Sequence, residues 1–157
     1  MPDPGALDLG HLALFVGFAV NDAVLVALEK AGHGALRSSH GFVFQHLVDG
    51  ERTIGELAER QGVTQQAISK AIAELEGMGY VERATDASDA RVRRVRLSAR
   101  GQAAVAASRR ARAAVERKLA TQLGEAALAE TRARLAQALE ALGGADAVRS
   151  RAVRAPR

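Results

Sequence analysis

The chain has 157 residues, 48% of them hydrophobic and 25% charged, so it is long enough for one domain with a core and too short for two independent enzymatic domains. Its formal net charge of +4 is compatible with a polyanionic partner but too small to establish one. The absence of cysteine excludes a disulfide framework, a thiol redox switch and a cysteine-ligated zinc site.

Residues 8–30 are predicted to form a helix that is apolar around most of its circumference. Its longest apolar run, from Leu12 to Val20, is too short to span a bilayer and is followed by Asn21 and Asp22, so we expect no membrane contact. No Lys or Arg precedes the run, unlike in a secretory signal, which favours a cytoplasmic protein. Because so apolar a helix needs cover on several sides, we expect a second copy of the chain as its partner.

A second helix is predicted to begin after a cap at Ser38 or Ser39. It carries apolar side chains from Phe42 to Val48 and ends at the turn formed by Asp49 and Gly50.

Two short helices joined by a glycine turn follow. Thr53 and Glu56 have the spacing of a capping box, in which each side chain accepts a hydrogen bond from the other's backbone N–H. After Gly62, Thr64 is a second N-cap, for a helix over residues 65–77. This pattern predicts a helix-turn-helix unit, whose second helix enters the major groove of DNA. Helix pairs in any small bundle have a similar periodicity, so the unit alone does not establish DNA binding.

The two faces of this second helix differ in chemistry. Its predicted buried stripe consists of Ala67, Ile68, Ala71, Ile72 and Leu75. The candidate DNA contacts on its cap and outer face are Thr64, Gln65, Gln66, Ser69 and Lys70. Neutral hydrogen-bonding side chains and one cation suit base edges and phosphates. A plain solvated face would more often carry paired Glu and Lys.

Residues 80–83 and 92–97 are predicted to be the two strands of a hairpin, joined by a polar loop. Five arginines and no acidic residue lie between Arg91 and Arg100. Arginines on such a hairpin, Arg91 and Arg93 among them, can enter the narrow and negative minor groove. The alternative is a solvated edge strand that positive charge keeps from pairing with other chains.

Ser98 is predicted to cap a long helix over residues 99–121, and Gly124 separates it from another that ends near Leu142. Each helix has one apolar stripe, so the two resemble arms rather than a second core. From residue 143 onward the chain is rich in Gly, Ala and Arg, and we expect disorder there. The predicted organisation is therefore an N-terminal dimerisation helix (1–35), a DNA-binding domain (36–101), C-terminal dimerisation helices (102–142) and a basic tail (143–157).

Four segments between Thr53 and Gly101, TIGELAERQGVTQQAISK, LEGMGYVER, DASDAR and VRLSARG, together resemble the MarR family of bacterial winged helix-turn-helix transcriptional regulators. The flanking helices fit the family's dimer arms, so the resemblance covers about residues 8–142. It implies a mainly α fold with a small β-hairpin wing, in which a winged helix-turn-helix domain is flanked by N- and C-terminal dimerisation helices. It further implies a ligand-responsive repressor that binds an inverted repeat in double-stranded DNA as a homodimer.

The family's wing motif, Asp-x-Arg, falls on Asp89 and Arg91. By this resemblance Arg91 enters the minor groove, and Asp89 holds the wing in shape by pairing with an arginine. Gly41, His46 and Arg94 depart from the family, which usually has apolar residues there.

Among the four histidines, no pair has the i, i+4 spacing of a helical metal site, and we expect no metal or other cofactor. The family binds small, often aromatic acids in the crevice between its arms and its reading head. This resemblance makes His11, Phe15, His40 and Phe44 candidate contacts to a small aromatic or phenolic effector.

No grouping of residues supports an enzyme: there is no phosphate-binding glycine loop, no Cys nucleophile and no spaced Ser, His and acid. The remaining alternative is a winged helix that binds protein or nucleic acid nonspecifically. Salt dependence and competitor DNA would discriminate between it and a specific regulator.

Overall fold

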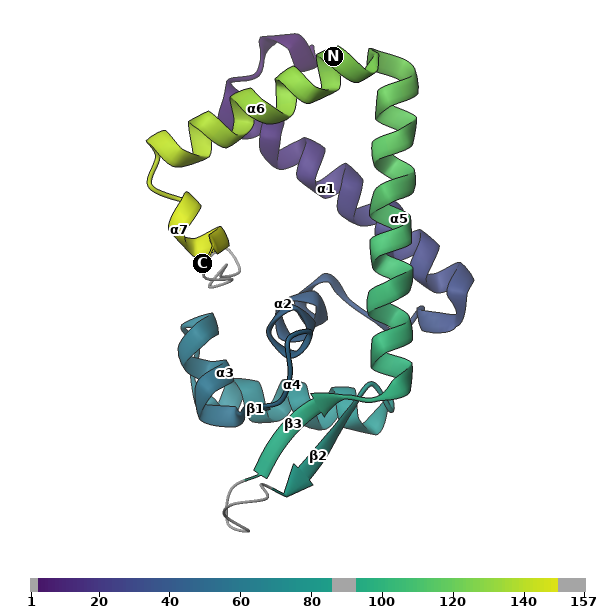
Figure 1. Cartoon of the computed structure of the whole chain (residues 1–157), viewed down its shortest axis with the longest axis vertical. Helices are drawn as coiled ribbons and strands as arrows, with labels where there is room; N and C mark the ends of the chain where they lie inside the picture. The colour runs from purple at the N-terminus through teal and green to yellow at the C-terminus, as the bar shows by residue number, and fades with distance from the viewer. Residues whose placement is uncertain (1–2, 86–92, 150–157) are drawn as a thin grey trace.

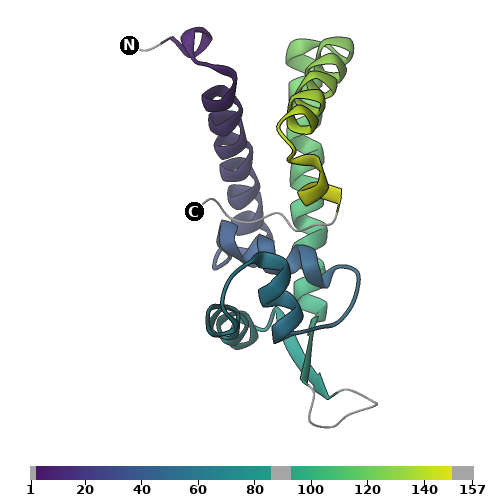
Figure 2. The same ribbon diagram turned by 90° about the vertical axis from the view of Figure 1, so that its left-hand side faces the viewer.

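The computed structural model describes residues 3–85 and 93–149. It has two parts (Figures 1 and 2): a head of short helices and a small sheet, and a set of long arm helices, of which the first two reach the head and the last starts from their far end. The head contains α2 (Ser38–Leu47), β1 (Arg52–Thr53), α3 (Ile54–Gln61), α4 (Gln65–Gly77), β2 (Val81–Thr85) and β3 (Arg93–Leu97). The arms are α1 (Leu9–Leu28), α5 (Ala99–Leu123) and α6 (Glu125–Ala141), and the shorter turns are η1 (Pro4–Ala6), η2 (Glu29–His33) and α7 (Ala145–Arg149). This confirms the predicted mainly α fold with a small β wing.

Side-chain caps begin the helices where the sequence predicted them. Thr53 Oγ1 accepts the backbone N–H of Glu56 at 3.2 Å, and Glu56 Oε2 accepts that of Thr53 at 2.7 Å. This second bond is the main cause that lowers the pKa of Glu56. Thr64 and Ser98 each accept the N–H of the residue three positions later, at 3.1 Å. The capping box and both single caps are confirmed.

The cap of α2 differs from the prediction. Ser38 is already the first helical residue, and Arg37 occupies the cap position, so neither Ser38 nor Ser39 caps the helix. Instead the His40 ring turns back, and its Nδ1 accepts the backbone N–H of Arg37 at 3.1 Å. The Ser38 hydroxyl accepts a hydrogen bond from the Asn21 amide of α1 at 2.6 Å, which ties this arm to the head.

The sheet has three antiparallel strands in the order β1-β3-β2. Val81 lies opposite Leu97 on the predicted hairpin, and Thr53 lies opposite Arg94 on the additional strand β1. With two residues, β1 is too short to show an alternating pattern, so it was not predicted. The pairing with β1 places the start of α3 beside the wing.

One apolar core joins the head to the lower parts of the arms. Its most completely buried large side chains are Tyr80, Leu57, Ile72, Leu75 and Val95, all in the head. Val24 and Leu28 of α1 and Ala104, Ala107 and Ala111 of α5 belong to the same cluster. The head and the bases of the arms therefore share a core across the predicted boundaries at residues 35 and 101.

Ala67 was predicted to be buried and is exposed. The buried stripe of α4 follows Ile68, Ile72 and Leu75, and position 67 is turned away from Ile68 by about 100° around the helix.

Beyond its contact with α5, α1 is exposed and apolar. Leu12, Phe15 and Phe18 keep 37%, 53% and 54% of their surface accessible. The helix α1 runs past the polar pair Asn21 and Asp22 to Leu28, and the turn η2 that follows is broken at Gly32, whose φ of +84° is not helical. By length and composition alone Leu9–His33 could cross a membrane, so the length of the apolar run does not by itself exclude a span.

The expected disorder after residue 143 does not extend to Ala145–Arg149, which form α7. The Arg149 guanidinium binds Asp146 within α7 at 2.8 Å, and its ion pair with Glu140 at 2.7 Å links the short helix to the end of α6. Residues 150–157 lie outside the described residues.

Candidate nucleic-acid interface

The helix-turn-helix unit places the N-terminal half of α4 on the outside of the head. α3 ends at Gly62, whose φ of +64° is the left-handed conformation that glycine adopts without a Cβ penalty. Behind α4, Ile68, Ile72 and Leu75 are at most 2% exposed. α4 is therefore fixed by its apolar face, and its opposite face is free to contact another molecule.

The predicted contact residues lie together on that face. Thr64, Gln65, Gln66, Ser69 and Lys70 are all exposed. The Gln65 amide nitrogen lies 3.6 Å from the point where a Cβ on Gly55 would stand, so Gln65 lies across the first turn of α3. Gln66 and Lys70 are one turn apart on α4, and the helix N-terminus adds a partial positive charge that favours phosphate.

Several wing arginines are engaged within the protein rather than free for DNA. Arg96 binds Glu82 at 2.7 Å and Glu51 at 3.5 Å, and the bond to Glu82 is the main cause that raises its pKa. Arg94 approaches Glu56 at 3.8 Å. The arginine run was interpreted as a local positive patch, but acidic residues from other parts of the chain offset at least these two charges.

Arg100 is also engaged, because its guanidinium stacks 4.7 Å from the centre of the Tyr80 ring. Arg93 is exposed at the first position of β3. Arg91 and Asp89 lie outside the described residues, so their predicted roles stay predictions.

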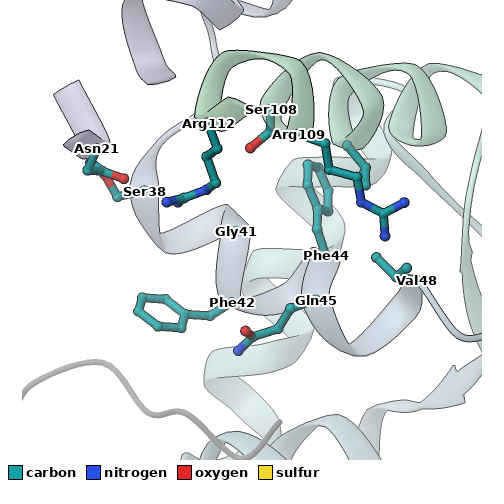
Figure 3. A pocket seen from close by; sticks show the side chains of 11 residues that line it. Asn21, Ser38, Gly41, Phe42, Phe44, Gln45, Val48, Ser108, Arg109 and Arg112 are labelled. Carbon is teal, nitrogen blue, oxygen red and sulfur yellow. The ribbon is translucent and has the colours of Figure 1, made fainter. Parts of the chain in front are cut away.

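A pocket of about 510 Å³ opens between α2 and α5 (Figure 3). Phe44, Val48 and Val105 contribute apolar walls, and the polar groups come from α1, α2 and α5. The side chains that line it are Asn21, Ser38, Gly41, Phe42, Phe44, Gln45, Val48, Val105, Ser108, Arg109 and Arg112. Two arginines beside aromatic rings suit an aromatic anion.

A smaller cavity of about 80 Å³ lies beside this pocket and shares Phe44 and Arg112 with it. It brings the predicted effector contacts His40 and Phe44 together with Arg112. His11 and Phe15 line neither cavity: both are exposed on the outer part of α1, where His11 Nδ1 lies 2.5 Å from Asp8. Sequence reasoning missed Arg112, which lies three residues after Arg109 and four after Ser108 on one face of α5.

His33 and His40, near the base of the arms, are buried. Burial lowers the pKa of His40, the nearby Arg37 lowers it further, and Glu74 opposes the shift. Burial also lowers the pKa of His33, with a contribution from Arg100. Within residues 3–85 and 93–149, no group of three or more His, Asp or Glu side chains is arranged to hold a metal ion.

A family model described as MarR family matches residues 37–92. No protein of curated function matches the sequence. Several solved structures have the same fold. YusO from Bacillus subtilis is 26% identical with a TM-score of 0.66, over 82% of this chain and 92% of that chain.

Two further similar structures contain ligands. A MepR variant from S. aureus, bound to an oligodeoxyribonucleotide, is 22% identical with a TM-score of 0.60, over 87% of this chain and 99% of that one. A MarR family protein from Mycobacterium tuberculosis, in complex with salicylic acid, is 26% identical with a TM-score of 0.59, over 82% and 94%. The match to each structure includes most of the head and of the arms.

Proposed function

We propose that the chain is a DNA-binding transcriptional regulator of the MarR family, a ligand-responsive cytoplasmic repressor that binds an inverted-repeat operator as a homodimer. The observation that carries the DNA-binding role is the polar outer face of α4, supported by a completely buried inner face. The oligodeoxyribonucleotide bound to the similar MepR variant supports the same role.

In this proposal the N-terminal half of α4 enters the major groove. Gln66 reads base edges, Lys70 binds phosphate, and Thr64, Gln65 and Ser69 complete the contact. Arg91 and Arg93 of the wing approach the minor groove, where they need no base-specific partner. Asp89 holds the wing in shape.

The homodimer rests on the apolar surface that the arms leave exposed. Phe15 and Phe18 of α1 are more than half exposed, and Leu135 and Leu139 of α6 are 39% and 41% exposed. A groove of about 400 Å³ between α1 and α6 adds to this surface. Large exposed apolar patches on a monomer mark interfaces. Two copies related by a twofold axis would cover the patches and carry two α4 helices.

A bilayer would also cover α1. We favour a second chain because α1 packs against α5 and its Asn21 is hydrogen-bonded to Ser38 of the head. Light scattering without detergent tests this choice: the proposal expects a discrete dimer. A chain that stays dispersed only with detergent would support a membrane-bound helix instead.

The effector proposal rests on the pocket between α2 and α5. Arg112 supplies a guanidinium for a carboxylate, and Phe44 supplies an aromatic wall. The salicylic acid bound to the similar mycobacterial protein supports a small aromatic acid. Calorimetric titration with salicylate should show binding that Arg112→Ala weakens at least tenfold. Arg110→Ala, an exposed neighbour on α5 that does not line the pocket, should leave the affinity unchanged.

Selection from a random duplex pool tests the function as a whole. The purified chain should enrich one inverted repeat and keep its preference for it over competitor DNA as salt rises. A nonspecific winged-helix module would enrich nothing and would lose nearly all binding in the same salt series.

A further inference from the structure

An ion pair links the recognition helix α4 to the cap of α2. Arg37, at the cap of α2, places its Nη2 2.6 Å from Oε1 and 2.5 Å from Oε2 of Glu74. Glu74 lies on the third turn of α4. The pair therefore links the helix that carries Gln66 and Lys70 to a helix that lines the pocket.

His40 holds the arginine in place. Its ring is buried, and Nδ1 accepts the backbone N–H of Arg37 at 3.1 Å. Its Nε2 lies 3.3 Å from Nη2 of Arg37 and 3.7 Å from Oε2 of Glu74. The backbone N–H and the guanidinium of Arg37 thus both contact the buried His40 ring. These contacts fix the position from which the guanidinium binds Glu74.

The same two residues face the ligand site. Arg37 and His40 line the small cavity together with Arg112, and that cavity adjoins the larger pocket. A carboxylate bound there would compete with Glu74 for Arg37.

We propose that Glu74 is a positioning residue for DNA recognition: held by Arg37 and His40, it fixes the angle of α4 against α2 and so sets where Gln66 and Lys70 meet the DNA. This inference rests on the proposed DNA-binding function. Positioning by Glu74 strengthens DNA binding, whereas the negative charge of Glu74 by itself weakens it. Glu74 follows Gln66 and Lys70 at intervals of one helical turn on α4, and a negative charge on the helix that binds DNA disfavours nearby phosphates.

The direction in which DNA affinity changes when Glu74 is substituted therefore discriminates between positioning and electrostatic repulsion alone. Glu74→Gln keeps the shape of the side chain and removes one negative charge. Electrostatics alone predicts equal or tighter DNA binding, whereas loss of positioning predicts weaker binding. Glu76→Gln is the charge-matched control, because Glu76 also lies on α4 but pairs with Arg83 of β2, at 3.1 Å, and not with the pocket wall.

The experiment is a fluorescence anisotropy titration of the full chain with the duplex enriched from the random pool. We expect Glu74→Gln to weaken binding about 5- to 20-fold, within the usual range of coupling between sites, and Glu76→Gln to leave it equal or tighter. The melting temperature should change little, because the pair is largely exposed and such pairs contribute little to stability. Full or increased affinity of Glu74→Gln would overturn the proposal.

If Glu74→Gln lowers the melting temperature by more than about 4 °C, its weaker DNA binding could reflect lost stability. Exchanging the charges of Arg37 and Glu74 then provides the test. The double variant with Arg37→Glu and Glu74→Arg restores the pair in reverse and should recover at least half of the affinity that Arg37→Glu alone loses. Failure to recover would overturn the positioning role. A different result would contradict the proposed function itself: a wild-type chain that prefers no duplex over competitor DNA.

Discussion

Gly101 lies directly against the backbone carbonyl of Tyr80. A Cβ at position 101 would stand 2.1 Å from the Tyr80 oxygen and 3.1 Å from Cδ2 of Leu97. The first turn of α5 therefore packs on the residue before β2, which joins the long arm to the base of the wing.

This contact predicts that Gly101→Ala destabilises the protein by about 3 kcal/mol, because a backbone carbonyl cannot move aside as a flexible side chain would. Gly77→Ala, at the exposed end of α4 with nothing within 4 Å of the added Cβ, should stabilise it by up to about 1 kcal/mol. Urea denaturation of the two variants measures both values. Equal stability of the two would show that Gly101 and Tyr80 are not in contact.

The buried histidines predict how stability depends on pH. The pKa values of His33 and His40 are lowered in the folded chain from the ordinary value of 6.5, so the unfolded chain takes up protons first as the pH falls. Below pH 6.5 the free energy of unfolding should therefore decrease, and above it should be flat. The pKa values of Glu56 and Asp8 are lowered from 4.5 and 3.8, so both groups titrate outside this window.

Melting curves between pH 5 and 8 test this dependence. The double variant with His33→Gln and His40→Gln should have a shallower slope below pH 6.5 than the wild type, even if it melts at a lower temperature at pH 8. An unchanged slope would assign the dependence to other groups.

Gln66 and Lys70 should have different effects on DNA binding. Gln66→Ala should lower the preference for the enriched duplex by about 1 to 3 kcal/mol, whereas Lys70→Ala should weaken binding to every duplex alike. Lys118→Ala removes the same charge from exposed α5 and serves as the control for Lys70→Ala. Competition titrations measure affinity and preference together. If the Gln66 variant keeps the full preference, its side chain does not read a base.

The wing arginines should contribute differently to DNA affinity, according to the acidic partners that each has within the protein. Arg96 is held by Glu82 and Glu51, so Arg96→Ala should change DNA affinity by less than about twofold. Arg93→Ala should weaken it by about 1 kcal/mol or more, with unchanged melting temperature. A larger loss for Arg96 than for Arg93 would mean that DNA displaces the glutamates and recruits Arg96.

Local signals in the sequence predicted much of this fold. The capping box at Thr53 and Glu56, the cap at Thr64 and the helical stripe of α4 each depend on residues close together in the chain; both caps are confirmed, and so is the stripe at Ile68, Ile72 and Leu75 but not at Ala67. The exposed face of α4 followed from the same periodicity.

Contacts between distant segments were not predictable in this way. Arg96 pairs with Glu51, which is 45 positions away, and Arg37 pairs with Glu74, which is 37 away, so no local pattern reveals either pair. Strand β1 forms only because β3 lies beside it. The arginine Arg112 belongs to the pocket because α5 crosses α2, a relationship that a single sequence does not contain.

We expect two chains, joined through their arms, to recognise DNA together. Deleting residues 125–157 removes α6 and with it Leu135 and Leu139, and should give a monomer or an aggregate whose DNA affinity is lower by at least about 100-fold, since the tethered second binding event is lost. The head should remain folded, because its core includes no residue of α6.

Light scattering of the complex between the full chain and the enriched duplex is the most direct measurement. We expect two chains on each inverted repeat, with half-site centres about 34 to 36 Å apart, and an affinity at least about 100-fold weaker for a duplex that holds one half-site. One chain on each duplex, with equal affinity for the half-site and the full site, would contradict this expectation.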